Sequence, residues 1–225
     1  MQIDILTLFP KMFDGVLSES MLKRAQKKGL LDVRIHNIRD WTSDRHRTAD
    51  DCPYGGGPGM VMKVEPIYYA LEAIVGENRK KIKIILLTPQ GKKLDQALAK
   101  RLSRYERLVL ICGHYEGVDE RVKRLVTDEI SIGDYILTCG EIPAMVIVDS
   151  VARLIPGVVG DPDSITRESF EGGILEYPQY TKPRAFKGMR VPEVLLSGDH
   201  GAIDAWRTSQ AHKRTKSRRP DLLAR

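Results

Sequence analysis

Three glycine-bearing loops in this 225-residue chain each follow a short apolar or β-branched run. They are TPQG at 88–91, GHYEG at 113–117 and IGDYILTCG at 132–140. Runs of this kind predict strands, and glycine loops that lead from strands into helices leave main-chain N–H and C=O groups accessible. In α/β folds such loops meet at one edge of a parallel sheet, where ligands bind. The loops therefore predict a small-molecule site built mostly from main chain.

Four carboxylates are candidates for acid–base chemistry. Glu116 lies inside the second glycine loop, whereas Asp161, Glu168 and Glu176 lie in or beside a glycine- and acid-rich stretch that follows Pro156. A carboxylate in a glycine loop at a sheet edge is well placed for ligand contact. Acids in a linker more often serve solubility, and that alternative stays open for the other three.

Arg153 ends an otherwise apolar helical pattern, AMVIVDSVARLI. An unpaired guanidinium on such a face would be costly to bury. We therefore expect Arg153 to reach an anion or a functional site.

Other common catalytic motifs are missing. The segment YGGGPG at 54–59 lacks the Lys-Ser/Thr of a P-loop, and no segment has the GxGxxG spacing followed by an acid that binds dinucleotides. The five histidines are scattered, no metal cluster is indicated, and no nucleophile elbow occurs. ATP-, NAD- or hydrolase chemistry is thus not expected. The small residues of YGGGPG either form a bare turn or let the backbone approach a planar or phosphate-bearing ligand.

Composition excludes several classes of protein. With 42% hydrophobic and 29% charged residues, the chain is globular and not disordered. Its three cysteines, Cys52, Cys112 and Cys139, form no CxxC pair and indicate free thiols in a reducing compartment. The start MQIDILTLFP has no basic region and predicts a strand instead of a signal peptide. No apolar stretch is long enough for a membrane span, so we expect a cytoplasmic protein with no membrane association.

Positive charge is concentrated at the C-terminal end. The formal net charge is +6, and residues 182–225 hold 11 Lys/Arg against 4 Asp/Glu, whereas the first 181 residues are nearly balanced. A basic tail on a neutral body indicates a polyanionic partner, most commonly nucleic acid. A solvated helix end is the alternative.

The body of the chain alternates strand and helix patterns. This alternation predicts an α/β fold, a mostly parallel sheet with helices on both faces, followed by a small helical C-terminal module. We expect strands at 3–9, 31–38, 82–87, 107–112 and 129–132, and helices at 10–28, 64–75, 92–102, 118–126, 141–155, 192–196 and from 201 to about 213.

Six segments in order carry a resemblance to a known family: MQIDILTLFP, RTADDCPYGGGPGMVM, LLTPQG, CGHYEGVDERV, IGDYILTCGEIPAMVIVDSVARLIPGVVG and LEYPQYTKP. Together they resemble the bacterial tRNA (guanine-37-N1)-methyltransferases of the SPOUT superfamily, from Met1 to the C-terminal helix. The resemblance implies a trefoil-knotted domain at 1–160, a mobile linker at 161–175 and a basic tRNA-binding domain at 176–225. It also implies an obligate homodimer whose active sites are shared between subunits.

The resemblance further implies two sets of binding residues. S-adenosylmethionine would be held by the three glycine loops, through Pro89, Gly91, Gly113, Tyr115, Glu116, Ser131, Ile132, Gly133, Asp134, Tyr135, Ile136, Leu137, Gly140 and Pro143. The tRNA would meet Tyr54, Gly55, Gly56, Gly57, Glu176, Arg207, Lys213 and Arg214. Family members need Mg²⁺, for which the sequence shows no dedicated motif.

By the same resemblance, Glu168 and Arg153 are the catalytic candidates for methylation of guanosine 37. Glu168 stands where the family has an Asp as general base, and Arg153 matches the arginine that stabilises the guanine. Cys139 is a second departure, since the family usually has Gly there. Two alternatives remain: a SPOUT methyltransferase acting on ribosomal RNA or a ribose 2′-oxygen, and a cofactor-sensing RNA-binding module without activity.

Overall fold

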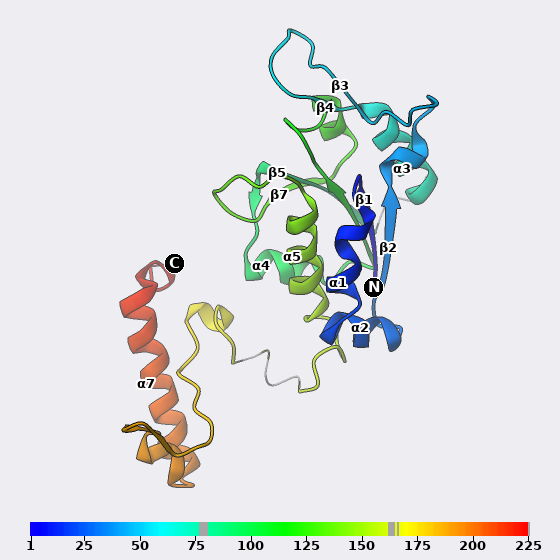
Figure 1. Ribbon diagram of the computed structural model, residues 1–225. Coiled ribbons are helices and arrows are strands. Elements are labelled where there is room, and N and C mark those ends of the chain that lie inside the picture. The colour runs from blue at the N-terminus through cyan, green and yellow to red at the C-terminus, as the bar shows by residue number, and fades with distance from the viewer. Residues whose placement is uncertain (77–80, 162–164, 166, 225) are drawn as a thin grey trace. The chain divides into compact units, whose positions relative to one another are not determined.

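A computed structural model describes residues 1–76, 81–161, 165 and 167–224 of the chain. These residues form two compact units, Met1–Gly160 and Asp161–Arg225 (Figure 1). Across the described ranges, no helix is both long and apolar enough to cross a membrane.

The first unit is built on a five-stranded sheet in which every neighbouring pair is parallel. Its strand order is β2-β1-β6-β5-β7, so the carboxyl ends of all five strands lie at one edge. The expectation of a mostly parallel sheet is confirmed. The strands are β1 (Gln2–Thr7), β2 (Asp32–Asn37), β5 (Ile82–Lys93), β6 (Arg107–Cys112) and β7 (Asp128–Ser131).

Both faces of the central strands are buried, which is why β6 and the first half of β5 are nearly continuous apolar runs. In β6, Leu108, Leu110 and Cys112 enter one core cluster, whereas Val109 and Ile111 enter the other. Helices therefore cover both faces, as the alternation of patterns predicts (Figure 1). The first core includes α2 (Ser20–Lys27), α4 (Gln96–Leu102) and α5 (Glu141–Ala152), and the second includes α3 (Val64–Val75), η2 (Ile38–Trp41) and η3 (Glu120–Arg124).

The single helix predicted at 10–28 is wrong. The segment forms three short pieces, η1 (Pro10–Phe13), α1 (Asp14–Leu17) and α2, with a break before Ser20. Glu19 is extended and Ser20 has a φ of 49°. The apolar spacing continues through the break because Phe13, Leu17 and Leu22 all pack on the same core.

The helix predicted at 92–102 begins later, at Gln96, because β5 continues to Lys93. In this strand Leu87 and Lys92 both pair with Ile130 of β7, and 88–91 bulge out between them. Asp95 then caps α4, its carboxylate accepting a hydrogen bond from the Leu98 amide at 2.7 Å. Two other predicted helices are shorter than expected: 118–126 keeps only η3, and 141–155 ends at Ala152.

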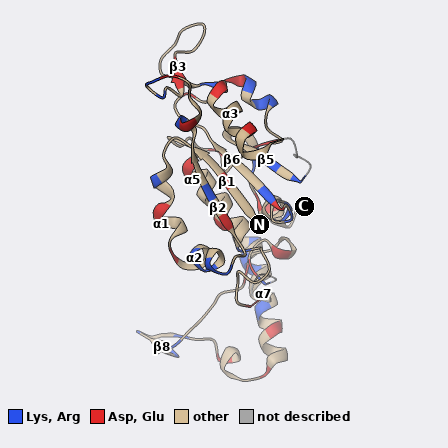
Figure 2. Cartoon of the chain, turned by 90° about the vertical axis from the view of Figure 1, so that its right-hand side faces the viewer, with Lys and Arg blue, Asp and Glu red and all other residues tan. Residues whose placement is uncertain are grey.

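The second unit centres on α7 (His200–Arg218), which is longer than predicted and carries several of the basic residues (Figure 2). Asp199 caps it by accepting a hydrogen bond from the Ala202 amide at 3.0 Å. Buried Thr215 accepts a hydrogen bond from the Leu175 amide at 2.9 Å, which joins the preceding extended chain to the helix. Smaller elements complete the unit: η4 (Glu171–Gly173), β8 (Ala185–Phe186), β9 (Met189–Arg190), η5 (Glu193–Leu196) and η6 (Pro220–Leu222).

A buried carboxylate ties the strands of the sheet together. Asp4 of β1 is fully buried; its carboxylate lies 2.8 Å from His36 Nε2 of β2 and accepts a 2.7 Å hydrogen bond from Arg107 Nε of β6. Arg107 also donates to the Ile74 carbonyl of α3 at 2.9 Å. Burial opposes ionisation of Asp4, but the hydrogen bonds from His36 and Arg107 outweigh it and lower the pKa of Asp4 below its ordinary value.

Replacing this carboxylate should destabilise the first unit in a pH-dependent way. Asp4→Asn removes the charge, and we expect a loss of about 1–3 kcal/mol of unfolding free energy near pH 5. Because the folded pKa is lowered, the stabilisation is present above the unfolded pKa of about 3.9 and is lost as pH falls through the folded value. The loss caused by the substitution should therefore shrink toward pH 3. Urea unfolding in a Trp206→Phe background, where Trp41 beside His36 reports on this unit, measures it.

Asp32→Asn is the matched control, because the Asp32–Arg34 pair is more than half exposed and should contribute little. An Asp4→Asn effect that equals the control, or that does not change with pH, would contradict this assignment.

Candidate functional site

The carboxyl-end edge of the sheet carries a cavity of about 520 Å³, lined by the three glycine loops that follow β5, β6 and β7. Cavities of this size hold ligands of cofactor dimensions. Twelve of the residues predicted to bind the cofactor line it: Pro89, Gly113, Tyr115, Glu116, Ser131, Ile132, Gly133, Tyr135, Ile136, Leu137, Gly140 and Pro143.

Two predicted residues are not among those that line the cavity. Gly91 lies in the bulge of β5, where an added Cβ would be 2.4 Å from the Ile130 nitrogen of β7. Its lack of a side chain thus permits the close approach of the β5 bulge to β7. Asp134 is exposed, and its carboxylate accepts a hydrogen bond from Lys93 Nζ at 2.8 Å, which links the third loop to the end of β5. A cofactor-binding role for these two residues stays a prediction.

The second and third loops touch through their main chains. Gly140 donates a hydrogen bond to the Gly113 carbonyl at 2.7 Å, and His114 and Cys139 form a backbone bridge beside it. A Cβ on Gly140 would lie 2.7 Å from Cys112 Cα and from the Gly113 nitrogen, with no flexible side chain able to move away. The cavity wall at this point is therefore bare backbone.

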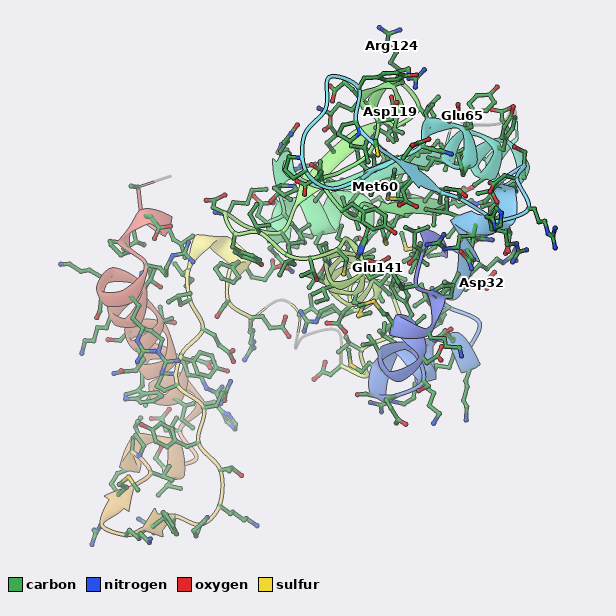
Figure 3. All side chains as sticks on the ribbon, turned by 45° about the horizontal axis from the view of Figure 1, so that its top comes forward. Asp32, Met60, Glu65, Asp119, Arg124 and Glu141 are labelled. Atoms are coloured by element: carbon green, nitrogen blue, oxygen red, sulfur yellow. The ribbon has the colours of Figure 1, made fainter. Side chains whose placement is uncertain are left out.

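The YGGGPG segment is held beside this cavity by a short hairpin. The hairpin consists of β3 (Asp50–Asp51) and β4 (Val61–Met62). The Glu116 amide donates to the Met60 carbonyl at 3.1 Å, and the Asp119 amide donates to the Met62 carbonyl at 2.9 Å. Figure 3 labels Met60 and Asp119 on these segments. Two motifs about 60 residues apart in sequence thus meet at Glu116. Predicted substrate contacts Tyr54, Gly55, Gly56 and Gly57 lie exposed in this loop.

The start of α5 places a buried acid, Glu141, between two residues that line the cavity, Gly140 and Pro143. Glu141, labelled in Figure 3, is fully buried, and its Oε1 accepts a 2.5 Å hydrogen bond from Thr7 Oγ1 of β1. Its Oε2 has no hydrogen-bond partner among the described atoms. Potential ligand atoms of His114, Cys139 and Glu141 all lie within 4.8 Å of one another. The sequence interpretation overlooked Glu141; an acid at the start of an otherwise apolar helix was the available signal.

Two cysteines near this acid are poor nucleophiles. Burial raises the pKa of Cys112 strongly, and the charge of Glu141 adds to that effect. Burial and the neighbouring Glu141 carboxylate raise the pKa of Cys139 as well. Covalent catalysis by a thiolate is therefore not supported at this cavity.

Arg153 lies at the opposite end of α5 from the cavity. It follows Ala152 as the C-terminal cap, whereas Gly140 and Pro143 at the other end line the cavity. Twelve helical residues span about 18 Å at 1.5 Å per residue. The first unit alone therefore does not bring Arg153 to the glycine loops.

The second unit gathers several of the remaining candidates around a smaller cavity of about 290 Å³, whose lining includes Glu168, Glu176 and Arg207. The Arg207 guanidinium lies 5.0 Å from the centre of the Tyr177 ring, and Arg214 donates to the Glu176 carbonyl at 3.3 Å. Lys213 is exposed on α7. Residues 167–175 form a turn in which the Glu171 amide donates to the Glu168 carbonyl at 3.1 Å.

Comparison with known proteins identifies the family. A family profile described as "tRNA (Guanine-1)-methyltransferase TrmD" matches residues 1–225. This chain belongs to that family. Similar proteins include one from Carboxydothermus hydrogenoformans, 61% identical over 99% of this chain and 87% of its own length. Another, from Dictyoglomus turgidum, is 59% identical over 99% of this chain and 90% of its own. Both are named tRNA (guanine-N(1)-)-methyltransferase.

Membership in this family agrees with the geometry of the cavity at the carboxyl edge of the sheet. Of the charged candidates in the first unit, Glu116 lines the cavity, whereas Arg153 lies at the far end of α5. Such a cavity can hold a donor molecule, and it needs groups from elsewhere to act on an acceptor.

Proposed function

We propose that this protein transfers a methyl group from S-adenosylmethionine to N1 of guanosine 37 in tRNA. The observation that supports this most strongly is the cavity formed by three glycine loops at the carboxyl edge of the sheet, in a chain that matches the family from end to end. Residues 1–160 would bind the methyl donor, 161–175 would act as linker and 176–225 would bind tRNA.

The cavity suits S-adenosylmethionine in size and chemistry. Main-chain groups at Ile132 to Leu137 offer donors and acceptors to an adenine ring, and Glu116 offers a carboxylate to the cationic methionine end. The missing side chain at Gly140 lets the third loop approach the second closely, so that main chain forms this part of the wall. When bound, S-adenosylmethionine supplies an activated methyl group on its sulfonium.

The protein's own task is to make guanine N1 nucleophilic. N1 carries a proton at neutral pH, so a carboxylate must accept that proton as the new N–C bond forms. We assign this role to Glu168. Arg153 would stabilise the negative charge that develops on O6, and the loops would hold the reacting atoms in line.

We also propose that the first unit is knotted. Two close main-chain contacts support this proposal: Gly91 of the β5 bulge against β7, and Gly140 against the end of β6. Both lie within residues 1–160, which the resemblance assigns to the knotted domain, and neither leaves space for a side chain.

A homodimer with shared active sites accounts for the position of Arg153. If each site used only its own first unit, Arg153 would be one helix length from the cavity. Exposed apolar side chains on α5 and on the neighbouring η1 and α1 offer a surface for a second copy. They are Met12, Val16, Ile142 and Val146.

A Mg²⁺ requirement remains a prediction, and we derive no catalytic step from it. In the part of the chain that the structure describes, one group of side chains approaches metal-ligand spacing, and it offers nitrogen, sulfur and oxygen. Mg²⁺ prefers an octahedron of oxygens, so this group does not fit it.

Methyl transfer from labelled S-adenosylmethionine to an unmodified tRNA transcript with guanosine 37 tests the proposed function. We expect incorporation that stops primer extension at position 37 and disappears when Mg²⁺ is removed. A transcript with adenosine at 37 is the control. Incorporation into ribosomal RNA or a ribose 2′-oxygen would favour the related SPOUT activity, and tRNA binding without incorporation would indicate a binding module.

Replacing Glu168, the proposed base, should lower the rate of methyl transfer more than the affinity for tRNA. Glu168→Gln keeps the size of the side chain but cannot accept the N1 proton, and we expect kcat to fall by about 10²–10⁴-fold. Single-turnover kinetics and tRNA binding measure the two effects separately. Glu193→Gln is the control, because the Glu193–Arg184 pair is mostly exposed. Full activity of Glu168→Gln would remove Glu168 from the mechanism.

Mixing two inactive variants tests the shared site. If Arg153 of one subunit acts with Glu168 of the other, a mixed dimer of Arg153→Gln and Glu168→Gln contains one intact site. Random exchange should then restore about a quarter of wild-type activity, since half of the dimers are mixed and each has one working site of two. Activity that stays at the level of the separate variants would place both groups in the same subunit.

A further inference from the structure

We propose that His114, Cys139 and Glu141 form a binding site for one thiophilic divalent cation, of which Zn²⁺ is the best fit. The three side chains offer an imidazole nitrogen, a thiol sulfur and a carboxylate oxygen within 4.8 Å of one another. Two of its residues, His114 and Cys139, also line the cavity proposed for the methyl donor, but cation binding does not depend on methyl transfer.

Glu141 provides the observation that points to a ligand. The residue is fully buried, yet its Oε2 has no hydrogen-bond partner among the described atoms. His114 Nδ1 is likewise buried with no partner in that part of the chain. Leaving a buried polar atom unpaired costs about 1–3 kcal/mol, and more when the group is charged. A cation between Glu141, His114 and Cys139 would satisfy both atoms at once.

The backbone holds these side chains in place before any ion arrives. His114 and Cys139 face each other across an antiparallel bridge, and Gly140 is hydrogen-bonded to Gly113 beside them. Glu141 follows at once as the first residue of α5. Two short segments therefore fix all three donors, so little conformational entropy remains to be lost on binding.

Neighbouring side chains fix the orientation of two donors. Thr7 Oγ1 donates to Glu141 Oε1 at 2.5 Å, which leaves Oε2 as the atom for a ligand. The His114 ring packs against Phe9, with centroids 4.9 Å apart, and against Tyr115 at 4.5 Å. Support of this kind around metal ligands sets their geometry and raises affinity.

The donor set selects the class of cation. Thiolate, imidazole and carboxylate together suit Zn²⁺ and Co²⁺, whereas Mg²⁺ and Ca²⁺ prefer oxygen alone. Zn²⁺ bonds of about 2.0–2.3 Å place ligand atoms within about 4 Å of one another, so the three donors need only a small adjustment. On binding, the Cys139 thiol gives its proton to solvent as the sulfur–metal bond forms.

The fourth coordination position would face the cavity. His114 and Cys139 belong to the lining of the large cavity. An ion held there would keep an open position for water or for a ligand atom, as zinc sites with three protein ligands do.

Titration of the reduced full-length protein with Co²⁺ tests the site. Cobalt bound to a thiolate gives a sulfur-to-metal absorption band in the near ultraviolet, and we expect one equivalent that equimolar Zn²⁺ displaces. Cys139→Ser should abolish the band, and Glu141→Gln should weaken Co²⁺ binding by about tenfold or more. Circular dichroism of each variant checks folding; Cys139 is only partly buried, so its serine variant should fold even if Glu141→Gln does not.

Cys52→Ser is the matched control, because Cys52 is exposed and lies elsewhere, beside Met60. It should leave the band and the affinity unchanged. The proposal fails if wild-type protein gives no thiolate band. It also fails if the band survives Cys139→Ser, or if Cys52→Ser removes it.

Discussion

The cavity depends on contact between bare main chains. Gly140 lies directly against Cys112 and Gly113, with its amide bonded to the Gly113 carbonyl. No side chain can be added there without moving backbone on both sides, because both partners are held by the sheet and by α5. This one contact sets where the third loop crosses the second, where α5 begins, and therefore where Glu141 and the cavity wall lie. Packed interiors transmit such a constraint because they have little free volume.

The sequence predicts well the bounds of those helices and strands that their own residues determine. The bounds of α3 and β6 are those the sequence predicts, because both are long apolar patterns with clear ends. The break before Ser20 and the extension of β5 to Lys93 could not be predicted, since pairing with β7 and packing on a shared core override the local pattern. The site also combines predictable and unpredictable features. The glycine loops can be recognised in the sequence, whereas His114, Cys139 and Glu141 come together only in the folded chain.

Arg153 shows how an argument from sequence can propose a role for a residue without saying at which site it acts. Its guanidinium at the end of an apolar helix indicates a functional role, but the sequence does not say at which site. Folding puts Arg153 at one end of α5 and the cavity at the other, so the helix itself separates the two. Because α5 is rigid, Arg153 cannot reach the cavity of its own subunit along the helix. The homodimer proposed above would bring Arg153 from a second copy of the chain, and the apolar side chains exposed on α5 and α1 offer a surface for such a dimer.

Two fully buried carboxylates in the first unit, Asp4 and Glu141, differ in their hydrogen-bond partners. Asp4 has both oxygens engaged, by Gln2, His36 and Arg107, and it joins three strands. Glu141 has one oxygen engaged by Thr7, and the other has no hydrogen-bond partner among the described atoms. A buried acid is tolerated only where hydrogen bonds or cations compensate its desolvation. Asp4 satisfies that condition within the protein. Glu141 satisfies it only with a further donor or cation, and two residues whose ligand atoms lie within 4.8 Å of its carboxylate, His114 and Cys139, are themselves metal-binding types.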